Sequence, residues 1–246
     1  MSDQDLQAKG ALEKAPDGGD PPTRTSAATT GTPAGTPAQA TVIKARRDWH
    51  GMLARRLAEH WELAGSRFSG LVMRVKALYW GVQFGPHCRF FGPMLLSRKE
   101  GSSLVVGQRC IFRSGYKSNQ VGLNRPCSFS AMSMTARVKV GDYCAFSGTV
   151  IASSESITLG DRVVCGGNTT ITDTDWHGLH PSERRNPGRT APVVLEDDVF
   201  LGLGVTVLKG VTIGHGTFVA AGSVVTRSLP PMVLAAGNPA RVIREL

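Results

Sequence analysis

The sequence predicts an all-β solenoid preceded by a helical segment. The first reason is that aliphatic residues recur every six positions through much of the chain. The second is composition, because 29 of the 246 residues are Gly and only 7% are aromatic. A core of small aliphatic side chains with many glycines is typical of short strands joined by tight turns rather than of a helical bundle. With 41% hydrophobic residues, a packed core is expected and a wholly disordered chain is excluded.

Residues 1–41 are predicted to form a disordered, low-complexity tail. From residue 23 to residue 41 the segment consists almost entirely of Thr, Ala, Gly and Pro, which offer little to bury. Its first residues are acidic and include no apolar run, so a secretory signal is not expected.

Residues 42–83 are predicted to form an amphipathic helical segment. Apolar residues at spacings of three or four form one face before Ala64–Gly65 and another after it, which predicts two helices with a break between them. The first face comprises Val42, Ala45, Trp49, Met52, Leu53, Leu57 and Trp61. The second comprises Phe68, Leu71, Val72, Val75, Leu78, Tyr79 and Val82. We expect both faces to pack against the rest of the protein, with peripheral contact to a membrane surface as the alternative.

Positive charge is concentrated in the same part of the chain. The formal net charge is +9, and residues 42–100 contain eleven basic and four acidic side chains. Such a region suits an anionic membrane surface or an anionic substrate, or it is simply the solvated face of a helix. It contains no recognition motif for nucleic acid, so no nucleic-acid partner is predicted. No segment reaches the roughly 20 apolar residues of a membrane-spanning helix.

The cysteines are scattered and include no CxxC pair. They are Cys88, Cys110, Cys127, Cys144 and Cys165. An odd number without paired spacing predicts buried thiols in a reducing compartment rather than disulfides or a zinc site. We therefore expect a cytoplasmic protein with no bound metal. If the helical segment contacts a membrane peripherally, the inner face of the membrane is the expected place.

Residues 84–246 carry the six-residue period. In the C-terminal part it runs without a gap through Leu195, Leu201, Val207, Ile213, Val219 and Val225. Upstream it includes Met134, Val140, Phe146, Leu159, Cys165 and Ile171, after a weaker start at Phe84, Phe90, Leu96, Val106 and Phe112. A simple strand has a period of two and a helix a period of 3.6. A period of six indicates short flat strands joined by sharp corners, with three sides to each coil of a triangular β-solenoid.

Three stretches resemble the hexapeptide-repeat acyltransferases. They are GGNTTITDTDWHGLHPSERR at 166–185, VAAGSVVTRSLP at 219–230 and GNPARVIREL at 237–246. Within that superfamily, the chain resembles the maltose and galactoside O-acetyltransferases and related polysaccharide acetyltransferases. The resemblance implies a left-handed parallel β-helix, an exception to the usual right-handed crossover. It also implies a homotrimer that uses acetyl-CoA as its donor, with a pocket between subunits.

By this resemblance His177 is the catalytic residue, within an active-site loop at 173–190. The repeat is interrupted there, and an interruption is where a solenoid can form a pocket. An alcohol needs a base to attack a thioester, and a neutral imidazole suits that proton transfer near pH 7. His180 is the alternative base. Asp173 or Asp175 could orient the imidazole, and a backbone carbonyl would serve equally well.

Donor contacts are also implied by the resemblance. The motifs match coenzyme A positions of galactoside-type enzymes at Ala221, Thr226, Arg227, Arg241 and Arg244. Guanidinium groups suit the phosphates of the coenzyme. Small residues at the corners would let the pantetheine arm pass, and the backbone N–H groups near Leu203 and Gly204 are candidate oxyanion donors.

Acceptor contacts are predicted for Ser147, Asp175, His180 and Arg184. Galactoside and maltose enzymes have an Asn some 30 residues before the catalytic His, whereas this chain has Ser147. This difference argues against transferring their substrates to this chain. Arg184 is a candidate contact to an acidic sugar.

The function implied is transfer of acetyl from acetyl-CoA to a hydroxyl of a saccharide or polysaccharide precursor. Two alternatives remain, a nucleotide-sugar N-acetyltransferase and a trimeric scaffold without activity. A zinc-dependent carbonic anhydrase of the same fold needs three converging imidazoles. Only His177 and His180 lie close together in the sequence, so that class is disfavoured.

Overall fold

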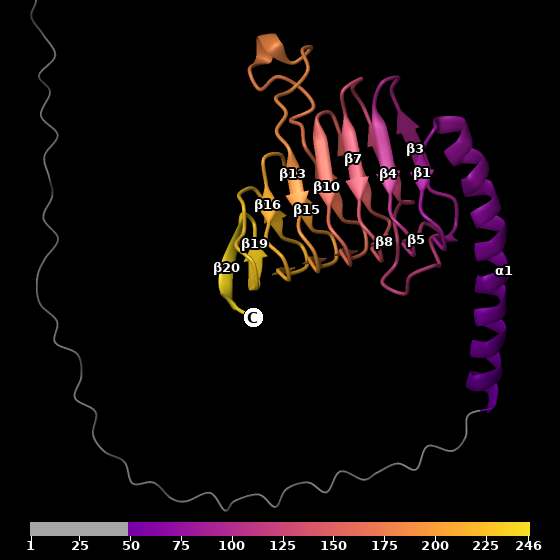
Figure 1. The fold of residues 1–246 in the computed structure, drawn as a ribbon. Helices are drawn as coiled ribbons and strands as arrows, with labels where there is room; N and C mark the ends of the chain where they lie inside the picture. Colours follow the sequence, from indigo (N-terminus) through magenta and orange to yellow (C-terminus); the bar gives the residue numbers. More distant parts are fainter. Residues whose placement is uncertain (1–48) are drawn as a thin grey trace, which may run out of the picture. The chain divides into compact units, whose positions relative to one another are not determined.

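The computed structural model describes residues 49–246 (Figure 1). The predicted disordered tail at 1–41 lies outside the described residues, as do Val42, Ala45 and the side chain of Trp61. The described chain contains one α-helix, a short 3₁₀ helix and twenty β-strands. The prediction of an all-β fold with an N-terminal helical segment is confirmed in this form.

The helical segment is a single helix, α1 (Trp49–Trp80), and not the predicted pair. The predicted break at Ala64–Gly65 is wrong because an isolated Gly costs a helix only about 1 kcal/mol and leaves every backbone hydrogen bond possible. A Cβ on Gly65 would contact nothing within 4 Å, so this Gly does not mark a bend or a close approach. None of the described helices is long and apolar enough to cross a membrane.

The apolar face of α1 does not pack on the strands as predicted. The buried residues of α1 are instead Ser69, Met73 and Ala77. They cover the first strands beside Phe90 and Met94. The second predicted face is exposed at Phe68, Leu71, Val75, Leu78 and Tyr79. The periodicity identified an apolar stripe correctly, but the end of the strand stack is covered by the opposite face, where Met73 lies between Ser69 and Ala77.

The strands form three sheets, and each sheet takes every third strand. Sheet A contains β1 (Gln83–Phe84), β4 (Ser103–Val106), β7 (Arg137–Val140), β10 (Ser156–Leu159), β13 (Val193–Leu195) and β16 (Thr212–Ile213). Sheet B contains β2 (Arg89–Phe91), β5 (Ile111–Arg113), β8 (Ala145–Ser147), β11 (Val164–Cys165), β14 (Phe200–Leu201), β17 (Phe218–Val219), β19 (Val233–Gly237) and β20 (Ala240–Glu245). Sheet C contains β3 (Leu95–Arg98), β6 (Ser128–Ala131), β9 (Val150–Ser153), β12 (Thr170–Thr172), β15 (Thr206–Val207) and β18 (Val224–Val225).

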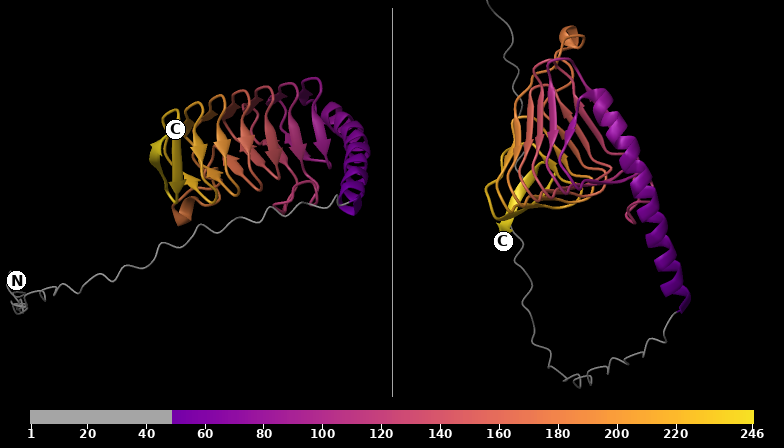
Figure 2. Two further views of the ribbon diagram at one scale, coloured as in Figure 1. Left: turned by 90° about the horizontal axis from the view of Figure 1, so that it is seen from below. Right: turned by 45° about the vertical axis from the view of Figure 1, so that its right-hand side comes forward.

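The chain therefore visits sheets A, B and C in turn, and we call one such circuit a coil. Strands of successive coils pair in parallel, for example Ile171 with Val207 and Val207 with Val225. The three sheets outline a triangle (Figure 2). We name its edges by the sheets they join, A–B, B–C and C–A. The last pair, β19 and β20, is antiparallel and ends the stack.

The repeated aliphatic residues point into the triangle. The six from Leu195 to Val225 are all fully buried, and aromatic rings stack at 5.0 and 5.3 Å along Phe90, Phe112 and Phe146. Met134 does not belong to the inward row, contrary to prediction. It is 62% exposed in the turn before β7, and Ala136 and Val138 are buried instead.

The cysteines are free thiols, and four of the five are buried. A hydrogen bond with the Cys144 thiol, together with burial, raises the pKa of Cys110 to about 12. A thiol with so high a pKa stays protonated and unreactive at neutral pH.

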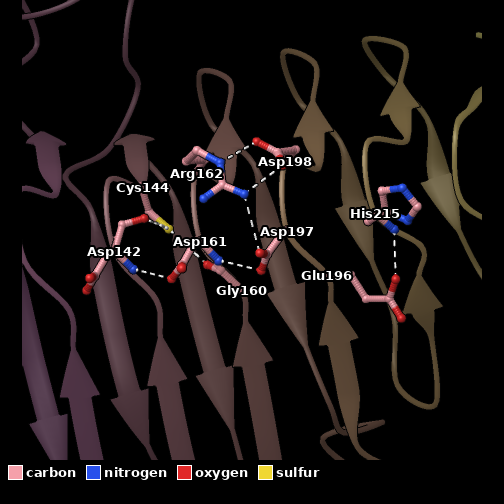
Figure 3. A network of polar contacts seen from close by, with 9 residues as sticks. All are labelled: Asp142, Cys144, Gly160, Asp161, Arg162, Glu196, Asp197, Asp198 and His215. Carbon is pink, nitrogen blue, oxygen red and sulfur yellow. Dashed lines mark hydrogen bonds and ion pairs between the residues drawn. The ribbon is translucent and has the colours of Figure 1, made fainter.

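The A–B edge is a regular ladder of carboxylates (Figure 3). The amide of Asp142 donates to the side chain of Asp161 at 2.8 Å, and the amide of Asp161 donates to Asp197 at 2.9 Å. Gly141 and Gly160 precede these turns because a Cβ there would collide with the carboxylate of the next coil. The hexad glycines on this edge are thus required by the close stacking of coils.

Candidate active site

The longest excursion from the coils leaves the C–A edge between β12 and β13. In Figure 1 it is the loop that extends beyond the strands above β13. Isolated antiparallel bridges join Thr174 to Thr190 and His177 to Pro187, so the excursion is a narrow two-stranded projection. It carries the 3₁₀ helix η1 (Pro181–Glu183) at its far end. The predicted active-site loop at 173–190 coincides with this projection.

Asp173 anchors the root of the projection. Its side chain is fully buried and accepts hydrogen bonds from the Ser153 hydroxyl at 2.7 Å and from the backbone amides of residues 154–156 at 2.7 to 2.9 Å. Four donors occupy this carboxylate, so it does not orient His177. That candidate role is wrong, and the reason is that Asp173 caps the turn between β9 and β10.

His177 lies on the exposed part of the projection. Its amide donates to the Asp175 carbonyl at 2.7 Å. A hollow of about 230 Å³ lies beside it, lined by Asp175, Glu183, Asn186 and Arg189 among others. An exposed imidazole at the border of a small polar hollow can meet a substrate from outside the chain.

Asp175 is tied to the neighbouring coil. Its Oδ1 atom lies 2.7 Å from Nζ of Lys209, and both side chains are partly buried. Its Oδ2 atom is buried and has no hydrogen-bond partner among the described residues. One carboxylate oxygen of Asp175 is therefore without a partner, two residues before His177 in the chain. Its predicted role in orienting His177 or contacting the acceptor stays a prediction.

His180 and Arg184 bracket the 3₁₀ helix. Nδ1 of His180 lies 2.7 Å from the Ser182 hydroxyl and accepts from the Ser182 amide, so the ring caps the turn. Arg184 ends the turn and is exposed. The capping contact gives His180 a local structural role, and its contact to an acceptor stays a prediction.

The other predicted residues lie elsewhere on the coils. Thr226 and Arg227 follow β18 on the C–A edge, where the register of β15 and β18 places them beside Leu208 and Lys209. Arg241 and Arg244 are exposed on β20. The basic side chains predicted for phosphate binding are thus all at the surface, near the C-terminal end of the stack.

The B–C edge carries the remaining predicted residues, Ser147, Leu203, Gly204 and Ala221. The coils stack tightly there, since a Cβ on Gly202 would lie 2.6 Å from the Ala221 amide nitrogen. The Gly204 amide donates to the Gly167 carbonyl at 2.8 Å. Its predicted role as an oxyanion donor is wrong, because that N–H is used to join two coils.

A second excursion, residues 114–127 between β5 and β6, covers the B–C edge and was missed in the sequence. Nδ2 of Asn119 donates to the Ser147 hydroxyl at 3.0 Å. Arg125 donates to the Asn168 carbonyl at 2.6 Å, and a side chain on Gly167 would meet both Val121 and Leu203. The signal was present as the long gap in the six-residue repeat after Phe112.

The predicted residues therefore lie on two edges of one chain. His177, Thr226 and Arg227 are on the C–A edge, whereas Ser147 and Ala221 are on the B–C edge. Sheet C separates the two edges. Among residues 49–246, no three His, Cys, Asp or Glu side chains come together as metal ligands.

The repeat is recognised by a family model. Residues 192–227, which include β13 to β18, match the model described as "Hexapeptide repeat of succinyl-transferase". These residues are therefore similar to the hexapeptide repeats of that family. In this segment an inward aliphatic residue and a tight corner recur because each six-residue unit supplies one side of a coil.

Several acetyltransferases are similar to this chain in sequence. The galactoside O-acetyltransferase of Escherichia coli is 38% identical over 105 residues, which cover 42% of this chain and 51% of the relative. That of Lactococcus lactis is 32% identical over 142 residues, which cover 57% of this chain and 62% of the relative. The chain thus spans about half to three fifths of the length of these relatives.

A solved structure shows the likeness of the fold. The polySia-specific acetyltransferase NeuO has a TM-score of 0.50 and 17% identity, over 67% of this chain and 75% of that chain. The comparison supports the three-sheet architecture and leaves the substrate open.

Proposed function

We propose that this protein is an acetyltransferase that moves an acetyl group from acetyl-CoA to a hydroxyl of a saccharide, with His177 as general base. The observation that carries this proposal is the projection at 173–190. The C–A edge is interrupted there to hold one exposed histidine beside a polar hollow, and the root of the interruption is fixed by Asp173 and by Lys209. The names of the similar acetyltransferases support the reaction class.

The donor supplies a thioester carbonyl, which a neutral alcohol attacks only weakly. In the proposed mechanism neutral His177 removes the proton from the acceptor hydroxyl as the new C–O bond forms. The C–S bond then breaks, and the imidazolium returns the proton to the departing thiolate. Asp175 stands close enough in the chain to stabilise the imidazolium through its free oxygen.

The donor would bind along the surface of the coils. Corners without large side chains, such as Gly202 with Ala221, leave room for a narrow pantetheine arm. Exposed Arg227, Arg241 and Arg244 are available for its phosphates. Leu203 remains a proposed contact, and Gly204 contributes as a small corner residue rather than as an amide donor.

The complete site would lie between two copies of a homotrimer. The C–A edge of one copy would supply His177, and the B–C edge of the next would supply Ser147, Leu203 and Ala221. This assembly accounts for the separation of the predicted residues within one chain. The coils would have the left-handed twist of the related β-helices, and the two excursions would meet across the interface.

The test of the reaction is release of free thiol from acetyl-CoA against a panel of mono- and oligosaccharides. We expect release that depends on the acceptor, and a higher melting temperature with the coenzyme because a ligand of the native state stabilises it. Absence of both thiol release and a rise in melting temperature would favour the scaffold without activity instead. Release with amino sugars but not with hydroxyl acceptors would assign N-acetylation instead.

The test of the shared site is complementation between two inactive variants. His177→Ala removes the base from one edge, and Ala221→Trp blocks the other. Trimers reassembled at random from an equimolar mixture should regain about a quarter of the wild-type activity, because an interface is complete only where Ala221→Trp supplies the C–A edge and His177→Ala supplies the B–C edge. No recovery, with mixed trimers shown to form, would place the whole site within one chain.

A further inference from the structure

The outer side of α1 carries an apolar stripe in two parts, one before residue 58 and one after residue 67. It comprises Trp49, Leu53, Leu57, Phe68, Leu71, Val75, Leu78 and Tyr79. These side chains are 53–85% exposed, although each is large and hydrophobic. A stripe this long exceeds the scattered apolar residues that a soluble surface normally shows, so it indicates an interaction surface.

The stripe lies opposite the face that covers the strands. At about 100° per residue, Val75 lies roughly 200° around the helix from the buried Met73, and Leu71 is equally far on the other side. Trp49 to Leu78 is 29 residues, or eight turns of 3.6 residues, so the stripe runs straight along the helix. The strands thus cannot cover it without α1 turning over.

A row of arginines borders the stripe. Arg56, Arg67 and Arg74 are exposed, and their spacings of eleven and seven residues place them on one line beside Leu78. Together they give α1 a positive border along most of its length. An apolar face with basic residues beside it is the pattern of a helix that lies in a membrane surface.

We propose that α1 binds the surface of an anionic membrane, with the stripe in the boundary between headgroups and acyl chains and the arginine row on lipid phosphates. This surface is separate from the acetyl-transfer site and does not depend on that proposal. It would hold the coils at the bilayer through their N-terminal end.

The charges and spacing favour a membrane over a second copy of the helix. A coiled coil needs a repeat of 3.5 residues and a narrow seam, whereas this stripe follows 3.6 residues and spans about a third of the circumference. Pairing two copies would also bring their arginine rows close together. Trp49 and Tyr79 lie near the two ends of the stripe, and such rings suit the polar boundary of a bilayer.

The test is sedimentation of the full chain with vesicles of phosphatidylcholine alone or mixed with phosphatidylglycerol. We expect at least about tenfold tighter binding to the mixed vesicles, weakening as salt rises. The double variant Leu71→Gln/Leu78→Gln should lose binding by about tenfold or more. Replacing Arg56, Arg67 and Arg74 by Gln should weaken it by about 100-fold on mixed vesicles only.

The matched control is Met134→Gln, a similarly exposed apolar residue in the turn before β7. It should bind vesicles like the wild type. Circular dichroism and melting temperature should be unchanged in the stripe variants, since these side chains bury little. Equal binding to both vesicle types would overturn the anionic specificity. No vesicle binding, with a smaller oligomer in Leu71→Gln/Leu78→Gln by light scattering, would overturn the proposal and assign the stripe to a second copy.

Discussion

Two edges of the coils differ in how their turns are filled. On the A–B edge, Asp142, Asp161 and Asp197 occupy equivalent positions, and each accepts the amide of the preceding coil. On the C–A edge, the turn after β12 expands into the projection that carries His177, and the turn after β15 sends Lys209 to hold it. The A–B edge repeats the same amide–carboxylate contact from coil to coil, whereas the turns of the C–A edge differ from one coil to the next.

The difference shows which edge of the coils can accept inserted residues while the strands keep their pairing. A regular edge fixes the spacing of the coils through short amide–carboxylate contacts that tolerate little added volume. An irregular edge can insert residues because the root of the insertion is capped, here by Asp173. Chemistry is therefore expected on the irregular edges.

The largest expected effect is that of His177→Ala on the irregular edge. Loss of a general base should lower kcat/KM for thiol release by about 10²–10⁴. His215→Ala is the matched control, because this histidine is exposed on the regular edge. It should retain nearly full activity. Equal losses of activity in both variants would contradict the assignment of catalysis to His177 on the C–A edge.

Lys209→Met should have the next largest effect. It removes the cation from Asp175 and frees the root of the projection, so kcat should fall about 10–100-fold through misplacement of His177. Lys139→Met on β7 changes an exposed lysine in the same way and should be silent. Steady-state kinetics with thermal melting would separate a positioning effect from unfolding. Unchanged kcat would show that the projection keeps its place without the ion pair.

Gly160→Ala should destabilise the regular edge. Its Cβ would crowd the Asp197 side chain and a backbone nitrogen at 2.8 Å, which is overpacking worth about 1–3 kcal/mol of unfolding free energy. The melting temperature should fall by about 2–4 °C for each kcal/mol. Gly65→Ala in α1 meets nothing within 4 Å and should shift it upward by a smaller amount. A downward shift for both would contradict the assignment of Gly160 to close stacking.

The smallest effect concerns acid sensitivity. Hydrogen bonds from the side chain and backbone of Gln108 lower the pKa of Asp142 below its usual 3.8. The stabilisation is therefore present above about pH 4 and is lost as the pH falls through the lowered value. Asp142→Asn should show a smaller drop in melting temperature between pH 6 and pH 3 than the wild type. Glu100→Gln, an exposed carboxylate in the turn before β4, should leave that drop unchanged.

Local features of the fold were predictable because each six-residue unit buries its own aliphatic residue. Leu201, Ile213 and Val219 face inward wherever the neighbouring coil lies, so the period alone identifies the strands. The projection was also predictable, since it interrupts that period. Gly65 misled the helix prediction because a Gly that only weakens a helix looks in the sequence like one that ends it.

Contacts between coils were not predictable in the same way. Asn119 meets Ser147 across 28 residues and Lys209 meets Asp175 across 34, and both depend on the stacking register that insertions set. Asp173 looked like a partner for His177 because it is close in sequence, yet its donors come from the preceding coil.

The sequence by itself determined the period, the strand class, the position of the projection and the apolar stripe of α1, because these depend on residues a few positions apart. Only the tertiary structure decided which face of α1 covers the strands and which edge holds each predicted residue. Those outcomes depend on how whole coils stack, because stacking brings together residues that are far apart in the sequence, such as Asp175 and Lys209. His177 and Ala221 belong to one motif-based prediction, but the stacking places them on different edges.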